Sequence, residues 1–98
     1  MNNTVYLLHF AEPFHHARHY LGTTKNLPFR IHQHLNGEGS PLVKAVMDAG
    51  ILVHLAATWE GGHALERQLK NRHNSPKLCP ICQAEAHIRT LMGEGDVQ

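Results

Sequence analysis

Five side chains between residues 6 and 66 have the chemistry that hydrolysis of a phosphodiester requires. They are two tyrosines, an arginine, a histidine and a glutamate: Tyr6, Tyr20, Arg30, His34 and Glu66. The reaction needs a proton acceptor for the attacking water, a cation for the phosphate and a ligand for a hard metal ion. Each side chain alone would fit an ordinary polar face or an aromatic core position. Together they are a suitable set for this chemistry.

Three predicted strands provide a frame for these residues. Residues 4–10 form a short apolar run rich in strand formers, and residues 19–22 form a second one, close enough in sequence to pair as an antiparallel hairpin. Residues 51–59 show the clearest strand pattern. There we expect one face to be shared by Ile51, Val53, Leu55, Ala57 and Trp59.

The first predicted helix begins at Leu27, where the period of the apolar residues changes. Leu27, Ile31 and Leu35 recur at helical spacing, which predicts a stripe that faces the core. Arg30 and His34 are four residues apart on an offset face of that helix. We therefore expect both side chains to reach solvent or substrate.

Two further helices and a weaker one follow. Ser40 and Pro41 are typical of an N-cap and a first helical residue, and Gly50 is placed as a C-terminal cap. Residues 63–73 form an amphipathic pattern that contains Glu66, and residues 84–92 have weak helical spacing. The predicted order is strand, strand, helix, helix, strand and helix, with a short C-terminal helix.

Composition indicates a single soluble α/β (α+β) domain. The chain has 98 residues, of which 42% are hydrophobic and 17% charged. No apolar run approaches the roughly 20 residues of a membrane span, and no signal-type segment opens the chain, so we expect a cytoplasmic location and no membrane partner. The net charge is only +1, so a site for a polyanion would have to be a local patch.

The order of the candidate residues resembles the GIY-YIG nuclease superfamily over roughly residues 4–74. Thr4-Val5-Tyr6 stands for the first tripeptide and Tyr20-Leu21-Gly22 for the second, and Asn26-Leu27 leads to Arg30 and then His34. The resemblance implies a small three-stranded antiparallel sheet flanked by helices. It assigns a compact nuclease domain to residues 1–78 and leaves a tail, packed on or extending it, at residues 79–98.

The resemblance also implies a role for each candidate residue in a metal-dependent DNA endonuclease. Tyr6 would help to deprotonate the attacking water, and Tyr20 would position water or phosphate. Arg30 would stabilise charge on the phosphate, and His34 would relay a proton or hold Tyr6. Glu66 would bind one Mg²⁺ or Mn²⁺, an ion that relies on few carboxylates.

The expected partner is double-stranded or branched DNA, recognised with low sequence specificity and with the help of a targeting partner or a second copy of the chain. Four basic residues are candidates for binding it: Lys25, Arg67, Lys70 and Arg72. Two alternatives stay open. One is a non-catalytic nucleic-acid-binding module of the same fold, and the other is a small zinc-stapled interaction protein.

A separate motif, Cys79-Pro80-Ile81-Cys82, lies in the tail. This spacing is typical of half a structural Zn²⁺ site, because both thiolates can face one ion across a tight turn. His73 and His87 flank the motif, and a second chain could also supply ligands. A redox-labile pair and two ordinary structural cysteines remain alternatives. The ten histidines are dispersed, and most are expected to be ordinary polar residues.

Overall fold

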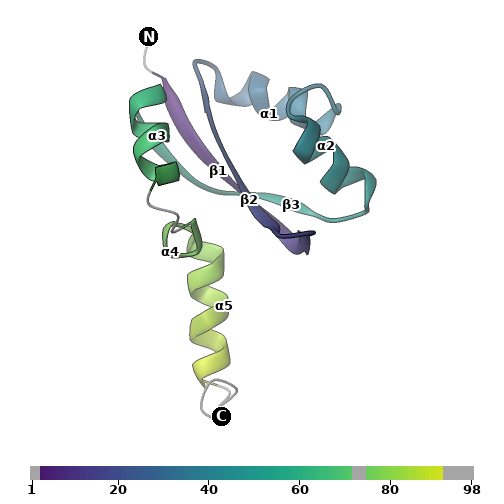
Figure 1. Ribbon diagram of the computed structural model, residues 1–98, viewed down its shortest axis with the longest axis vertical. Coiled ribbons are helices and arrows are strands. Elements are labelled where there is room, and N and C mark those ends of the chain that lie inside the picture. The colour runs from purple at the N-terminus through teal and green to yellow at the C-terminus, as the bar shows by residue number, and fades with distance from the viewer. Residues whose placement is uncertain (1–2, 72–74, 92–98) are drawn as a thin grey trace.

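The computed structural model describes residues 3–71 and 75–91, and an antiparallel sheet of three strands is at its centre (Figure 1). The strands are β1 (Thr4–Phe14), β2 (Ala17–Thr24) and β3 (Val53–Glu60). Their order is β2-β1-β3, so the central strand is the one that carries Tyr6. β1 and β2 form the predicted hairpin, although both strands are longer than the sequence predicted.

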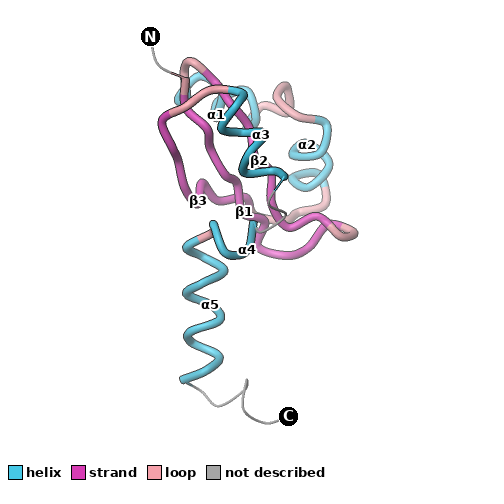
Figure 2. The backbone as a smooth tube through the Cα atoms, turned by 60° about the vertical axis from the view of Figure 1, so that its left-hand side comes forward, coloured by secondary structure: helices cyan, strands magenta, loops and turns pink. Residues whose placement is uncertain are grey.

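Helices cover both faces of this sheet and extend beyond it. They are α1 (Leu27–Leu35), α2 (Pro41–Asp48), α3 (His63–Asn71), α4 (Ser75–Leu78) and α5 (Pro80–Leu91). The predicted fold class and element order are confirmed. The short helix α4 was not predicted, and α5 begins four residues earlier than expected. In both views α5 projects from the body of the domain (Figures 1 and 2).

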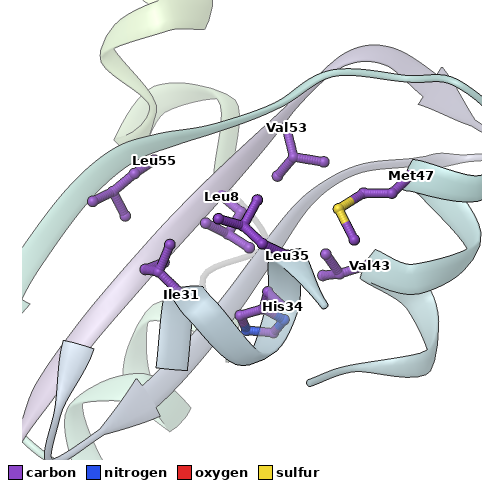
Figure 3. Close-up of a pocket in the computed structure, with 8 residues that line it drawn as sticks. All are labelled: Leu8, Ile31, His34, Leu35, Val43, Met47, Val53 and Leu55. Carbon is purple, nitrogen blue, oxygen red and sulfur yellow. The ribbon is translucent and has the colours of Figure 1, made fainter. Parts of the chain in front are cut away.

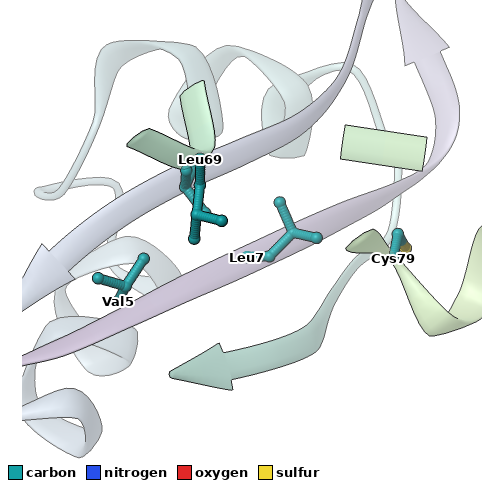
Figure 4. Packing of buried hydrophobic residues seen from close by; sticks show 5 residues of the cluster. Val5, Leu7, Leu69 and Cys79 are labelled. Atoms are coloured by element: carbon teal, nitrogen blue, oxygen red, sulfur yellow. The ribbon is translucent and has the colours of Figure 1, made fainter. Parts of the chain in front are cut away.

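Alternate residues of β1 pack into two separate cores. Tyr6, Leu8 and Phe10 face α1 and α2, where Val43 and Val46 meet them. The other face packs against α3 and the start of α5, through Val5, Leu7, Leu21, Leu69 and Cys79 (Figure 4). Full burial of each such aliphatic side chain contributes about 1.5–3 kcal/mol, so β1 holds both layers together.

β3 does not keep one apolar face, and this prediction was wrong. Leu7 pairs with Ala57 but Leu8 pairs with Leu55, so Ala56 is an extra residue in a β-bulge. The extra residue reverses the alternation: Val53 packs in the core under α1 and α2, whereas Trp59 packs in the core under α3. A sequence pattern of period two cannot reveal where such a residue is inserted.

The start of α1 agrees with its sequence signals, but its orientation does not. The Asn26 side chain accepts a hydrogen bond from the backbone N–H of Phe29 at 3.1 Å. Leu35, expected to face the core, is 67% exposed, whereas His34 is only 4% exposed. At about 100° per residue, His34 lies about 20° from the direction of Leu27 and Leu35 about 80° from it. His34 therefore takes the core-facing position.

The helix α2 matches its predicted ends. Ser40 caps its N-terminus by accepting a hydrogen bond from the N–H of Leu42 at 3.1 Å, and Pro41 is its first residue. Gly50 follows the helix with a φ of +81°, a conformation that suits glycine. Together α1 and α2 cover the sheet face on which Tyr6 lies.

Candidate active site

Tyr6 is the centre of the candidate site, and Gly22 makes room for it. The two residues are opposite each other in the β1–β2 ladder. A Cβ atom added to Gly22 would lie 2.6 Å from the Tyr6 hydroxyl oxygen and 3.0 Å from the ring of Tyr20. The glycine of the Tyr20-Leu21-Gly22 motif is therefore needed for close approach of the Tyr6 side chain to the backbone.

Two residues of α1 bind the Tyr6 hydroxyl. Its Oη atom is 2.8 Å from Nε2 of His34, and Nε of Arg30 donates a hydrogen bond to it at 3.3 Å. The tyrosine rings of β1 and β2 lie near each other, with 6.2 Å between their centroids, and Tyr20 also meets the His34 ring edge-on at 5.4 Å. The structure thus brings together Tyr6, Tyr20, Arg30 and His34.

The protonation states of Tyr6 and His34 follow from their burial and from the nearby charge of Arg30. Burial raises the pKa of Tyr6, and the nearby Arg30 guanidinium opposes this without cancelling it. Burial also lowers the pKa of His34, and the positive charge of Arg30 lowers it further. At neutral pH both groups are therefore uncharged, and in the Nδ1–H tautomer of His34 the phenol O–H donates to Nε2.

His34 is enclosed, which corrects the expectation that it reaches solvent. Its Nδ1 atom has no hydrogen-bond partner among the described residues, and Gly39 lies directly against the ring. Beyond the ring is a pocket that is apolar except for His34 (Figure 3). Its lining is Leu8, Ile31, His34, Leu35, Val43, Met47, Val53 and Leu55. Such a lining does not suit a phosphate, and His34 can act on substrate only through Tyr6.

Glu66 approaches from the opposite face of the sheet. It projects from α3 and accepts a hydrogen bond from the Thr23 hydroxyl. Thr23 is the residue after Gly22 and pairs with Val5, on the face away from Tyr6. The Gly22–Thr23 step of the edge strand β2 is therefore the place where the two halves of the site come near each other.

The Glu66 carboxylate is ionised and already has partners. Burial acts to raise its pKa, but hydrogen bonds from Thr23 and Lys70 outweigh burial and hold the pKa below its usual value. Lys70 Nζ is 2.9 Å from Oε2, and His63 Nδ1 is 3.9 Å from Oε1. The side chain of Glu66 is 18% exposed, so a small ion can reach it.

The oxygen donors at Glu66 fit a hard divalent cation. Within the described part of the chain, the only group of three or more candidate His, Cys, Asp or Glu ligands that comes together does not include Glu66. A single carboxylate beside a hydroxyl suits Mg²⁺ or Mn²⁺, since such ions keep several waters and share phosphate oxygens. Lys70 would have to release Oε2 for the ion to take both oxygens.

Three of the four basic residues expected to bind DNA lie in described segments. Lys25 is exposed between β2 and α1, and Arg67 and Lys70 are exposed on α3. The fourth, Arg72, lies outside the described residues. Of these, Lys70 pairs with Glu66, four residues earlier on the same helix, a pairing that the i, i+4 spacing in the sequence allows.

Sequence reasoning missed a second group of residues, which surrounds Cys79 and Cys82. His9 and His19, paired across the hairpin, lie beside both cysteines, and the four candidate ligand atoms are within 4.8 Å of one another. The two thiols are not joined by a disulfide. Of the two histidines suggested by sequence proximity, His87 is not in this group, and His73 lies outside the described residues.

This histidine–cysteine cluster (His9, His19, Cys79 and Cys82) was hidden by the other histidines. One sequence feature could have indicated the cluster. His9 and His19 lie in the two predicted strands of one hairpin, and the same chain has a Cys-x-x-Cys motif. Burial lowers the pKa of His19 to about 4 and raises the pKa of the Cys82 thiol to about 11. His19 is therefore a neutral imidazole at physiological pH, the form that can bind a metal.

Comparison with known proteins identifies the family of the chain. The sequence model of the GIY-YIG catalytic domain matches residues 2–78 of the 98-residue chain. No curated protein and no solved structure gives a significant match. In the described segments, no helix has the length and apolar character to cross a membrane. GIY-YIG domains are metal-dependent endonuclease domains, and this chain belongs to the GIY-YIG family.

Proposed function

We propose that the chain is a divalent-metal-dependent endonuclease that hydrolyses phosphodiester bonds of DNA with low intrinsic sequence specificity. The observation that carries the proposal is the hydrogen-bonded row Arg30–Tyr6–His34 in a domain of a nuclease family, with an ionised Glu66 held by Thr23, the residue after Gly22. This row offers a proton path and a fixed cation at one place, and both are needed for attack of water on a phosphate.

In this proposal Tyr6 and His34 move the proton of the attacking water. Tyr6 passes its phenolic proton to Nε2 of His34 and takes one proton from water. The water oxygen then bonds to phosphorus, the bond to the leaving oxygen breaks, and bulk water protonates that oxygen. Arg30 stabilises the transient phenolate through Nε and the phosphate through its remaining N–H groups.

Access to Tyr6 requires a movement when DNA binds. Tyr6 has no exposed surface in the free chain. Arg30 and Tyr20 lie against it and are both partly exposed, so a shift of these two side chains would open the hydroxyl to water. The side chain of Arg30 also donates to Gln33 at 3.3 Å, a contact that a phosphate would compete with.

Glu66 would hold the divalent cation, with Thr23 fixing the carboxylate. When bound, Mg²⁺ or Mn²⁺ supplies positive charge to the phosphate oxygens and lowers the pKa of a coordinated water. The two halves of the site would then act on one phosphate at the Gly22–Thr23 edge. Among the described residues, Arg30 supplies a cation on the Tyr6 side and Lys70 supplies one on the Glu66 side.

Low sequence specificity is expected because the exposed basic groups suit phosphates rather than base edges. Lys25 precedes α1, and Arg67 and Lys70 lie on α3, so cations flank the β2 edge from both sides. Contacts with phosphates orient DNA without reading its sequence. Three further points stay predictions. They are a preference for double-stranded or branched DNA, the involvement of a second copy or a targeting partner, and a cytoplasmic location.

The test is nicking of supercoiled plasmid by the full chain with Mg²⁺, with Mn²⁺ and with EDTA. We expect metal-dependent nicking that Glu66→Gln abolishes, whereas Glu60→Gln, a change to an exposed carboxylate at the end of β3, leaves the rate unchanged. Salt-sensitive DNA binding without nicking would instead identify a non-catalytic module. Absence of both DNA binding and nicking would favour the other alternative, a small zinc-stapled interaction protein.

A further inference from the structure

The histidine–cysteine cluster lies away from the Tyr6 hydroxyl, on the face of the sheet packed against α3 and the start of α5. His9 comes from β1 and His19 from β2, where they are paired. Cys79 precedes α5 and is fully buried, and Cys82 is in the first turn of that helix. Residues distant in sequence are therefore collected at the start of α5, the helix that projects from the domain in Figure 1.

Contacts in the cluster converge on one atom. Nδ1 of His9 is 3.4 Å from Cys79 Sγ, 3.5 Å from Cys82 Sγ and 3.4 Å from Nε2 of His19. An imidazole nitrogen has either one proton or one lone pair, so it can make one good hydrogen bond and not three. A shared partner at the centre of the four atoms accounts for all of these approaches.

The spacings are those of the edges of a tetrahedron around zinc. Bonds of about 2.3 Å to sulfur and about 2.05 Å to nitrogen place two nitrogens about 3.4 Å apart and a nitrogen and a sulfur about 3.6 Å apart. The His9–His19 separation is 3.4 Å, and the printed nitrogen–sulfur separations, including Cys82 Sγ to His19 Nε2, lie between 3.3 and 3.5 Å. Little movement is needed to accept the ion.

We propose that His9, His19, Cys79 and Cys82 bind one structural Zn²⁺ that fixes the start of α5 to the β1–β2 hairpin. Two thiolates and two imidazoles in tetrahedral positions suit Zn²⁺ better than Mg²⁺ or Mn²⁺, which prefer oxygen. Four protein ligands leave no open position, so this ion stabilises the fold and does not take part in cleavage. The site is complete within one chain.

Glu85 provides independent support, because it acts on the opposite nitrogen of His9. Its Oε1 atom is 3.6 Å from Nε2 of His9 and 3.7 Å from Nη2 of Arg18. A carboxylate at this position favours a proton on Nε2, which leaves the Nδ1 lone pair for a metal, and carboxylates are common around zinc-binding histidines. Arg18 in turn holds the carboxylate in place.

Metal content of untagged, full-length protein tests the proposal directly. We expect about one equivalent of zinc per chain by elemental analysis, and after exchange with Co²⁺ we expect the visible absorption of a tetrahedral thiolate site. Removing zinc with a chelator should lower the melting temperature, and excess Mg²⁺ should not restore it. This readout is independent of nuclease activity.

Matched substitutions identify the ligands. His19→Asn and Cys82→Ser should each lower zinc content severalfold or more, whereas His87→Asn, which changes an exposed histidine of α5, should leave it at the wild-type level. Glu85→Gln should retain zinc but weaken its affinity by about 10- to 100-fold.

Three results would overturn the proposal. One is wild-type protein that contains no zinc, has two freely titrating thiols and melts unchanged in chelator. The second is another metal at one equivalent per chain. The third is loss of zinc in His87→Asn together with retention in His19→Asn, which would assign the ion to different ligands. The first two results are measured on wild-type protein. They therefore test the proposal even if a variant fails to fold.

Discussion

The Tyr6 hydroxyl is 2.8 Å from Nε2 of His34, and both residues are buried. Burial keeps the imidazole neutral and the phenol protonated, and Arg30 Nε already donates to the phenol oxygen. In the Nδ1–H tautomer of His34, the phenol O–H donates to Nε2. His34 is therefore a positioning and relay residue in the proposed reaction, acting on substrate only through Tyr6. This relationship determines how cleavage should depend on pH.

Cleavage should slow in acid as His34 becomes protonated. The pKa of His34 is held below its ordinary value of 6.5, so the imidazole stays neutral above that pH and accepts its proton only below it. Protonated His34 cannot accept from Tyr6, and Arg30 and the Tyr6 and Tyr20 rings offer the new charge no carboxylate partner. We expect kcat/KM for plasmid cleavage to fall below about pH 6.5 and to change little between pH 7 and 8.

Substitution on the same helix separates this effect from a general loss of stability. His34→Gln removes the titrating group and should flatten the acid limb while lowering the rate. His32→Gln, a change to an exposed histidine two residues earlier, should keep the wild-type profile. An acid limb that persists unchanged in His34→Gln would assign it to another group.

Arg30→Lys should reduce the rate of cleavage by about 10²–10³-fold with little loss of DNA affinity. The change keeps the charge but removes the planar group that binds Tyr6 through Nε and has N–H groups left for phosphate. Single-turnover cleavage and equilibrium binding measure the two effects separately. Arg67→Lys, at an exposed position of α3, is the control, and an equal effect of both substitutions would argue against a special role for Arg30.

Gly22→Ala should damage the site through sterics alone. The φ angle of Gly22 is not positive, so alanine is compatible with the backbone, but its Cβ would lie 2.6 Å from the Tyr6 hydroxyl. Displacing Tyr6 by about 1 Å should slow cleavage by about 100-fold, and overpacking should cost about 1–3 kcal/mol of unfolding free energy.

Cleavage assays and chemical denaturation measure the two consequences of Gly22→Ala. The control is Gly62→Ala, because the atoms nearest to its added Cβ belong to the Asn3 side chain, at 3.0 Å or more. If Gly22→Ala retains the wild-type rate, the Tyr6 hydroxyl is not required in its observed position.

The element order was predictable because its signals are local. Caps such as Ser40 and Pro41, the turn glycine Gly50 and the apolar runs of the strands depend on neighbours a few residues away. The structure has the caps as predicted and a strand at each predicted run, with different strand ends. The proximity of Tyr6, Tyr20, Arg30 and His34 followed from the order of motifs that carries the family resemblance.

Features that depend on packing between distant segments were not predictable. The bulge at Ala56 moves Val53 and Trp59 to different cores, and the rotation of α1 buries His34 and exposes Leu35. Both outcomes depend on how a helix or a strand packs against its neighbours. The periodicity of apolar residues alone does not predict that packing. For the same reason the sequence did not show that His9 pairs with His19. That pairing depends on the register of the β1–β2 hairpin, which the structure provides.

The ion pair between Lys70 and Glu66 leads to a prediction about metal dependence. Lys70 Nζ is 2.9 Å from Glu66 Oε2, so the ammonium group occupies an oxygen that a divalent cation would use. Lys70→Met keeps much of the side-chain length and removes the competing charge. The Mg²⁺ concentration for half-maximal cleavage should fall by about two- to fivefold, the range expected for loss of an exposed ion pair.

A matched control for Lys70→Met exists on α2. Lys44 forms an ion pair with Asp48 that also measures 2.9 Å and also joins residues four apart, but it lies away from Glu66. Lys44→Met should leave the Mg²⁺ dependence unchanged. Lys70→Met should in addition weaken DNA binding and reduce its salt dependence by about one phosphate contact, if Lys70 also meets the DNA backbone. A Mg²⁺ requirement that rises in Lys70→Met, or that shifts equally in both variants, would show that Glu66 does not hold the cation.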